Sequence, residues 1–118
     1  MCGLVGIITN QHDCDNNILK QMTEALSHRG PDDSGTQIFD FENARVGLGH
    51  TRLSILDLSN NGHQPKESIS KRFTIIHNGE IYNFKEIQKE LIQKGYQFES
   101  ESDTEVVLNA FEEWGEDC

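Results

Sequence analysis

The sequence predicts an α+β domain, in which short strands combine with amphipathic helices. Residues 3–9 are rich in Leu, Val and Ile with two glycines between them, which is typical of a buried strand that another backbone approaches closely. Residues 36–39 and 45–48 are strand-like and flank a short acidic turn, which indicates a hairpin. Within residues 15–26, apolar side chains recur at spacings of three and four, as they do on one face of a helix.

Length and charge limit the class of protein. With 118 residues, the chain is one domain or part of one, large enough to bury a single core. Ten basic and twenty acidic residues give a net charge of −10, which repels nucleic-acid phosphates and anionic membranes. The longest apolar run, at residues 4–8, is far shorter than the roughly 20 residues of a membrane-spanning helix, and no basic signal-peptide region precedes it. We therefore expect a cytoplasmic protein that binds neither nucleic acid nor membranes.

The cysteines and histidines predict neither a disulfide framework nor a metal site. The cysteines, Cys2, Cys14 and Cys118, are odd in number and lack C-x-x-C spacing. The five histidines lack the i, i+4 spacing of a helical metal site. We expect no metal ligands in this chain.

The first helix is expected to begin at an N-cap among Asp13, Asp15 and Asn16 and to end at Gly30, which precedes a proline. The surrounding segment 27–35 concentrates charge, Gly and Pro, which favours a tight loop without a further role. The expected apolar face of the helix consists of Ile18, Leu19, Met22, Ala25 and Leu26.

Residues 49–57 alternate imperfectly between apolar and polar side chains, which favours a strand. Leu53 and Ile55 fall on one face of it, and Arg52 and Ser54 fall on the other. An arginine beside glycines is a candidate carboxylate ligand, because its guanidinium donates two parallel hydrogen bonds. A surface arginine in a salt bridge explains Arg52 equally well from spacing alone.

Residues 72–77 are β-branched and aromatic, and the strand that they predict leads into Asn78 and Gly79. An Asn-Gly pair is the strongest short signal for a two-residue hairpin turn. A functional interpretation is compatible with that turn, because the Asn78 amide and the Gly79 N–H can both donate to one developing oxyanion.

Two more helices are expected towards the C-terminus. The first begins at Asn83, with Glu86 placed for a capping box, and ends at Gly95. A short strand at residues 96–98 separates it from a second helix, which begins with the capping box at residues 102–105. The expected apolar faces contain Phe84, Ile87, Leu91 and Ile92 in the first helix and Val106, Val107, Ala110, Phe111 and Trp114 in the second.

Cys2 is the candidate nucleophile. A cytosolic aminopeptidase removes the initiator Met when the next side chain is small, so we expect Met1 to be cleaved and Cys2 to become the first residue. An α-amine has an unperturbed pKa of roughly 7.7 to 8.0 and can act as general base, and the thiol is the most nucleophilic side chain available. From composition alone, a free cysteine near a strand start is more often a small buried apolar residue.

Six blocks of sequence, at residues 1–7, 28–32, 49–55, 62–65, 78–83 and 102–105, resemble the glutaminase domain of class II glutamine amidotransferases in the same order. Pro31-Asp32 and Leu53-Ser54-Ile55 resemble, in particular, the branch of glutamine-hydrolysing asparagine synthetases. The resemblance covers residues 2–118.

The resemblance implies the N-terminal nucleophile (Ntn) hydrolase fold, a four-layer αββα arrangement with antiparallel sheets, here incomplete. It implies that Cys2 attacks the side-chain amide of glutamine and forms a thioester, while Asn78 and Gly79 form the oxyanion hole. Arg52 is then expected to bind the α-carboxylate of glutamine, and Glu80 and Asp103 its α-ammonium group. The implied glutamine-binding residues are Arg52, Leu53, Ser54, Ile55, Leu56, Asn78, Gly79, Glu80 and Asp103.

By the same resemblance, residues 2–118 form the N-terminal part of the glutaminase domain, and L-glutamine is the substrate. The ammonia is expected to serve ATP-dependent synthesis of asparagine from aspartate in a C-terminal synthetase domain outside this chain. ATP and Mg²⁺ belong to that domain, and the glutaminase part needs no cofactor. A homodimer is left open as the oligomeric state. The alternatives are the same chemistry with a sugar, a lactam precursor or a peptide as ammonia acceptor, and a non-catalytic binding module with this fold.

Overall fold

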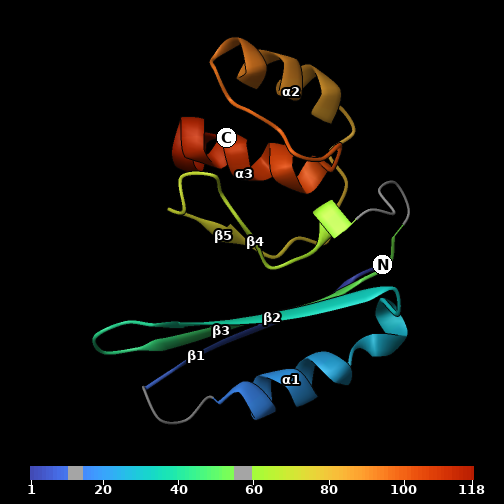
Figure 1. Cartoon of the computed structure of the whole chain (residues 1–118), viewed down its shortest axis with the longest axis vertical. Helices are drawn as coiled ribbons and strands as arrows, with labels where there is room; N and C mark the ends of the chain where they lie inside the picture. The colour runs from blue at the N-terminus through green and yellow to red at the C-terminus, as the bar shows by residue number, and fades with distance from the viewer. Residues whose placement is uncertain (11–14, 55–59) are drawn as a thin grey trace. The chain divides into compact units, whose positions relative to one another are not determined.

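The computed structural model describes residues 1–10, 15–54 and 60–118 and confirms an α+β chain with antiparallel sheets (Figure 1). It divides into a first unit, made of Met1–Ile55, His63–Pro65 and Ile76–Asn78, and a second unit, made of Leu56–Gly62, Lys66–Ile75 and Gly79–Cys118. In chain order, the elements are β1 (Gly3–Thr9), α1 (Asn16–Glu24), β2 (Asp33–Asp40), β3 (Arg45–Arg52), β4 (Lys66–Glu67), β5 (Thr74–Ile75), α2 (Phe84–Gln93) and α3 (Asp103–Trp114), with 3₁₀ turns at Ser27–Arg29, Asn60–Gly62 and Gly115–Asp117.

The first unit contains a three-stranded antiparallel sheet with β3 between β1 and β2. The predicted hairpin is confirmed: β2 and β3 pair from Asp40↔Arg45 onward, and Phe41 N donates to Ala44 O at 2.8 Å. The strand β2 is longer than predicted, because it already begins at Asp33. The strands predicted at residues 45–48 and 49–57 form one strand, β3, which ends at Arg52, so the prediction is wrong for residues 53 and 54, and residues 55–57 lie outside the described residues. The ladder therefore extends to the end of β3, where the candidate site residues begin.

The strand β1 is buried on one face only, which corrects the expectation of a fully buried strand. Leu4 and Ile8 are 43 % and 79 % exposed, whereas Val5 packs in the core. A Cβ atom added at Gly3 would lie 2.6 Å from Thr51 Oγ1, so the close approach predicted for a glycine of this strand is confirmed there. The predicted close approach is wrong at Gly6, where an added Cβ atom would meet no atom within 4 Å.

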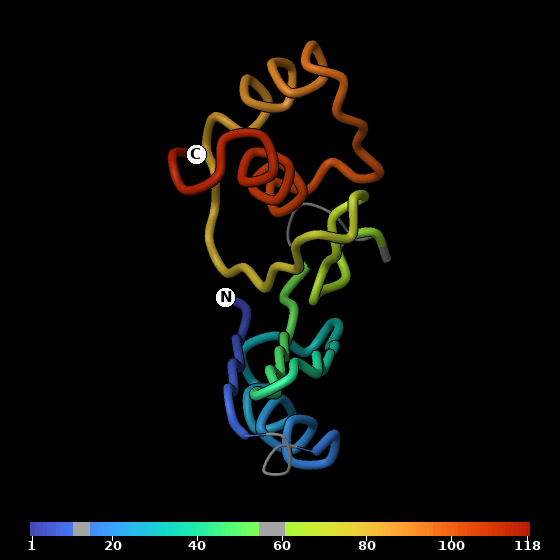
Figure 2. Tube along the Cα trace, turned by 90° about the vertical axis from the view of Figure 1, so that its left-hand side faces the viewer, coloured from blue at the N-terminus to red at the C-terminus, as the bar shows by residue number. Residues whose placement is uncertain are grey.

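The helix α1 lies along the buried face of this sheet (Figures 1 and 2). Its N-cap is Asp15, whose carboxylate accepts a hydrogen bond from Ile18 N at 2.8 Å. The α-helix ends at Glu24 and a 3₁₀ turn follows, so the predicted helix end at Gly30 is wrong. Leu19 is fully buried against Val5, but the predicted core residues Ile18 and Met22 are exposed, at 41 % and 39 %. Tertiary contacts, rather than helical spacing, decide which residues of this face are covered.

The second unit contains a minimal hairpin, in which β4 pairs with β5 in antiparallel register. The strand predicted at residues 72–77 is reduced to Thr74–Ile75, and its hairpin partner precedes it in the chain. The hairpin predicted at Asn78–Gly79 is therefore wrong: residues 79–83 lead into α2 without another strand, and Gly79 does not have the positive φ that a type I′ turn requires. The short strand predicted at residues 96–98 is also absent.

The helices α2 and α3 lie beside each other in both views (Figures 1 and 2) and share a core of Leu91, Val106 and Ala110. Gly95 has a φ of +99° just after α2, so the predicted glycine end of this helix is confirmed. Asn83 stands at the N-cap position as predicted but makes no side-chain capping bond. Ile92 and Phe111, which were expected in the apolar faces, are 54 % and 37 % exposed.

The capping box predicted at residues 102–105 forms only in part. The Ser102 hydroxyl accepts a hydrogen bond from Thr104 N at 3.2 Å, which confirms Ser102 as the N-cap of α3. The reciprocal bond from Glu105 to Ser102 N is not made, because Ser102 N donates to the Ser100 hydroxyl at 3.3 Å. Glu105 instead turns into the interior of the second unit.

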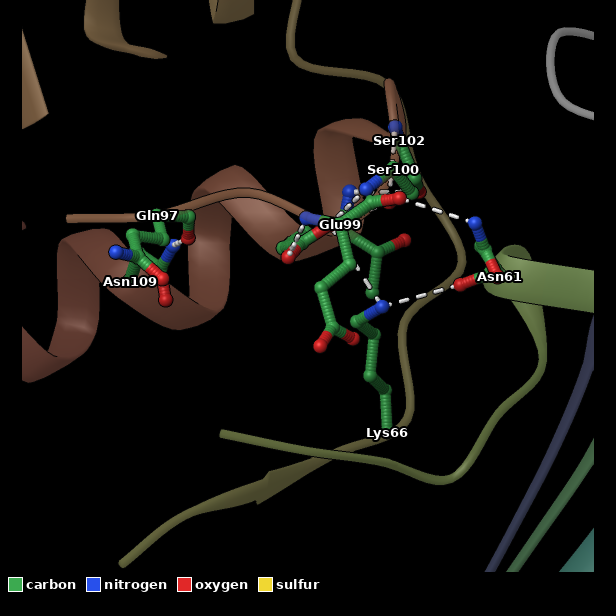
Figure 3. A network of polar contacts seen from close by, with 9 residues as sticks. Asn61, Lys66, Gln97, Glu99, Ser100, Ser102 and Asn109 are labelled. Carbon is green, nitrogen blue, oxygen red and sulfur yellow. Dashed lines mark hydrogen bonds and ion pairs between the residues drawn. The ribbon is translucent and has the colours of Figure 1, made fainter. Parts of the chain in front are cut away.

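Glu105 is 2 % exposed and organises a polar network. Figure 3 shows this network around its labelled members Lys66, Glu99 and Ser100. The Glu105 carboxylate accepts hydrogen bonds from Glu99 N at 2.8 Å, from Ser100 N at 2.9 Å and from the Ser100 hydroxyl. Lys66 Nζ lies 3.6 Å from Glu105 Oε2 and donates to Asn61 O at 3.0 Å. A buried charge is tolerated only when it is paired and hydrogen-bonded, and Glu105 meets both conditions.

We expect Glu105→Ala to destabilise the start of α3 by about 3 kcal/mol, because it leaves the part-buried N–H groups of residues 99 and 100 without their acceptor and Lys66 without its carboxylate partner. Hydrogen exchange of the amides at residues 99–106 measures this loss locally. Glu101→Ala is the matched control, since Glu101 is an exposed carboxylate in the same loop. Equal exchange rates in the two variants would contradict a structural role for Glu105.

Candidate active site

The backbone around Cys2 is held tightly against β3. Gly3 N donates to Thr51 Oγ1 at 3.1 Å, and the same hydroxyl donates to Leu26 O at 3.2 Å. Because an added Cβ at Gly3 would also come within 2.8 Å of Leu26 Cβ, this position has room for glycine only. The residue before it is therefore fixed at the start of the sheet.

Cys2 is half-buried, and three groups from distant parts of the chain contact it. Its N donates to Asn78 Oδ1 at 3.2 Å, and Leu53 N donates to its Sγ at 3.5 Å. Arg29 Nε donates to its carbonyl oxygen at 3.4 Å. The Leu53 N–H therefore lies within hydrogen-bonding distance of the sulfur, the atom that would act as the nucleophile.

The loop that carries Leu53 is clamped by Asp32 from both sides. Asp32 N donates to Arg52 O at 3.0 Å, and Ser54 N donates to Asp32 Oδ2 at 2.7 Å. An added Cβ at Gly30 would lie 2.6 Å from backbone atoms of Arg52, so this glycine permits the close approach of the two segments. The segment 27–35 thus positions the site, which is a role that the expectation of a simple loop missed.

Arg29 was not among the site residues predicted from the sequence. It precedes Gly30 in the block at residues 28–32 and reaches the Cys2 carbonyl from the 3₁₀ turn Ser27–Arg29. The available signal was the concentration of charge in that block.

Arg52 is the last residue of β3 and is 9 % exposed. This burial argues against the alternative of an exposed arginine in a surface salt bridge. A buried guanidinium is costly unless anionic or polar groups compensate it. Arg52 thus lies beside Leu53 as a buried cation, in the chain segment that contacts the Cys2 sulfur.

Asn78 is exposed, and its side chain is oriented by Cys2. Because the Cys2 N–H needs an acceptor, the carbonyl end of the Asn78 amide faces it, at 3.2 Å. The Nδ2 end of the same amide then points away from the Cys2 N–H. Cys2, Leu53 and Asn78, which were predicted from three separate blocks, are brought together in the first unit.

The remaining predicted ligands belong to the second unit or lie outside the described residues. Asp103, the first residue of α3, accepts a hydrogen bond from Ile81 N at 3.0 Å and so fixes the turn after Gly79 and Glu80. Glu80 is exposed. Their roles towards glutamine stay predictions. Ile55 and Leu56, which were also predicted to line the site, fall outside the residues that the structure describes.

Within residues 1–10, 15–54 and 60–118, no three His, Cys, Asp or Glu side chains are grouped as metal ligands. In the same part of the chain, no helix has the length and apolarity to cross a membrane. The contacts of Cys2 that the structure shows come from the Asn78 amide, the Leu53 backbone N–H and the Arg29 guanidinium.

Comparison with known proteins decides the family. The glutamine amidotransferase domain family matches residues 1–118. The chain belongs to this family. This chain is 42 % identical over 123 residues to asparagine synthetase 1 (glutamine-hydrolysing) of Bacillus subtilis. It is 41 % identical over 122 residues to asparagine synthetase 3 (glutamine-hydrolysing) of the same organism. It is also 34 % identical over 136 residues to a glutamine–fructose-6-phosphate aminotransferase (isomerizing) of Bartonella henselae.

These matches cover all or nearly all of this chain but little of its relatives. They span 100 %, 100 % and 92 % of this chain, in the order given above. The same alignments span only 18 %, 19 % and 21 % of the three relatives. Most of each relative therefore has no counterpart in the sequence described here.

Proposed function

We propose that this amidotransferase domain hydrolyses L-glutamine to glutamate and ammonia, with Cys2 as the nucleophile. The observation that carries the proposal is the convergence of Asn78 and Leu53 on the two groups of Cys2 that would react once Met1 is removed, its N and its Sγ. An amide donor beside a thiol is the pair that acyl transfer requires, because the thiol attacks the carbonyl and the amide stabilises the oxyanion. The family match supports glutamine as the amide that is attacked.

The proposed reaction begins once Met1 is removed, which frees the α-amine of Cys2. That amine takes the thiol proton, and Sγ attacks the side-chain carbonyl carbon of glutamine. Asn78 Nδ2 and Gly79 N donate to the oxyanion. The amine then returns the proton to the leaving nitrogen, ammonia departs, and a γ-glutamyl thioester remains. Water attacks the thioester, the amine takes its proton, and glutamate is released with the thiol restored.

We place the α-carboxylate of glutamine at Arg52 and its α-ammonium group at Glu80 and Asp103. A free amino acid carries both charges, so its site needs a cation and at least one carboxylate. The backbone of Leu53 and Ser54, held by Asp32, is proposed to line the same pocket, together with Ile55 and Leu56. For Glu80 and Asp103, which belong to the second unit, the proposal rests on their negative charge and on the family resemblance.

We further propose that residues 2–118 are the N-terminal part of an Ntn-type domain that supplies ammonia for ATP-dependent asparagine synthesis in a fused synthetase domain. The names of the two Bacillus subtilis relatives and their greater length support this acceptor. The named sugar aminotransferase relative supports a second candidate, in which the ammonia passes to a sugar. Ammonia-dependent product formation by the full-length protein, with aspartate and ATP or with a sugar phosphate, separates the two.

Covalent labelling tests the glutaminase proposal. We expect a glutamine-mimicking diazoketone to add one label to the full-length protein, at Cys2, and only to molecules that have lost Met1. Intact mass spectrometry reports both events together, and excess glutamine should protect the thiol. Cys118→Ala is the matched control, because Cys118 is an exposed cysteine in the second unit. A protein that has lost Met1 and takes no label at Cys2 would favour the non-catalytic module.

A further inference from the structure

His77 precedes Asn78, and two buried side chains form hydrogen bonds with its backbone, one at the N–H and one at the carbonyl oxygen. His77 N donates to Gln64 Oε1 at 2.6 Å, and His77 O lies 3.3 Å from His50 Nε2. Gln64 is 6 % exposed and His50 is 1 % exposed. The backbone that leads into Asn78 is therefore fixed from the interior of the first unit, although Asn78 itself is exposed.

The hydrogen bond to His77 O determines the tautomer of His50. Since a carbonyl oxygen only accepts, Nε2 must carry the proton, and Nδ1 is then an unprotonated acceptor. Among the described residues, Nδ1 is buried without a hydrogen-bond partner. Burial also lowers the pKa of the His50 imidazole, so the ring is neutral and this tautomer persists near neutral pH.

Gln64 is itself anchored to β2. The backbone carbonyl oxygen of Gln64 packs against Gly35, and a Cβ atom added at Gly35 would collide with this oxygen. The neighbouring His63 makes a hydrogen bond of 2.7 Å through Nδ1 to Asp33 Oδ2. Residues 63 and 64 are thus tied to the same sheet that carries Cys2 and His50.

We propose that Gln64 and His50 are positioning residues, which hold residue 77 so that the Asn78 side chain stays beside Cys2. This inference rests on the proposed function, because it takes Asn78 to be the oxyanion donor whose position the contacts of residue 77 maintain. The physical reason is the exposure of Asn78: an exposed side chain has few packing contacts to place it, so its backbone must be fixed instead. Misplacement of a catalytic group by about 1 Å can cost about 10²-fold in rate.

The test is a double-mutant cycle on the full-length protein, with glutamine hydrolysis as the readout. We expect Gln64→Met, which removes the acceptor of His77 N, to lower kcat by about 10-fold while KM for glutamine stays nearly unchanged. In the Asn78→Ala background, the same substitution should cost less than about 2-fold, since the group that it positions is already gone. His50→Leu should behave like Gln64→Met, and His50→Gln, which can still donate, should recover most of the rate.

Thr23→Val is the matched control, because Thr23 is a buried polar residue of the same unit whose hydroxyl donates to Leu19 O within α1. Thr23→Val should lower kcat by the same factor in the otherwise unchanged protein and in the Asn78→Ala background. If Gln64→Met and His50→Leu are also fully additive with Asn78→Ala, or if they raise KM instead of lowering kcat, the positioning role is wrong. If Asn78→Ala alone leaves kcat unchanged, the proposed function fails first.

Discussion

Cys2→Ala is expected to abolish glutamine-dependent activity, with a loss of about 10⁴-fold or more in kcat, because no other group of the site can form the thioester. The substitution removes a half-buried thiol that Leu53 N contacts at 3.5 Å, so little packing is lost with it. The measurement is glutamate release by the full-length protein. Product formation from free ammonia should continue, since that step does not use the thiol.

Cys118→Ala provides the control for this prediction, because it removes an exposed thiol outside the proposed site. It should leave both the glutamine-dependent and the ammonia-dependent rates unchanged. Residual glutamine hydrolysis in Cys2→Ala at more than about one per cent of the original rate would contradict a covalent mechanism at this residue.

Asn78→Ala is expected to lower kcat by about 10² to 10³, the usual cost of removing one oxyanion-hole donor. The same substitution also removes the acceptor that faces Cys2 N at 3.2 Å. Asn78→Asp separates these two roles, because it keeps an oxygen for the Cys2 N–H and loses the Nδ2 donor. We therefore expect Asn78→Asp to be at least as impaired as Asn78→Ala, which steady-state kinetics with glutamine measures.

Asn83→Ala is the matched control for Asn78, since Asn83 is an exposed asparagine that makes no side-chain capping bond. It should change kcat by less than about 2-fold, as surface substitutions without such contacts usually do. Full activity in Asn78→Ala would show that the oxyanion is stabilised elsewhere.

Local sequence signals predicted much of the secondary structure. The acidic turn between β2 and β3 gave the hairpin, and Asp15, Ser102 and Gly95 marked helix ends correctly. These signals work because caps and turns depend on residues that are neighbours in the chain. They are also the features on which tertiary packing has the least influence.

The errors arose where packing overrides local preference. Asn78 and Gly79 have the composition of a hairpin turn, but Asn78 Oδ1 is engaged by Cys2 N, and the chain continues towards α2. Ile18 and Met22 have helical spacing, but only Leu19 of that face reaches Val5 in the core. Glu105 has the position of a capping-box residue, but the half-buried Lys66 and two backbone N–H groups hold its carboxylate inside the second unit.

By itself, the sequence determined the chemical identity of the candidate site: a cysteine at position 2, an arginine at the end of a strand, an amide before a glycine, and the family that carries them. Only the tertiary structure decided that Asn78 and Leu53 contact the two ends of Cys2 and that Asp32 and Gln64 hold their backbones. The reason is that these contacts join residues 13 to 76 positions apart, and local propensity contains no information about which distant groups share a sheet edge.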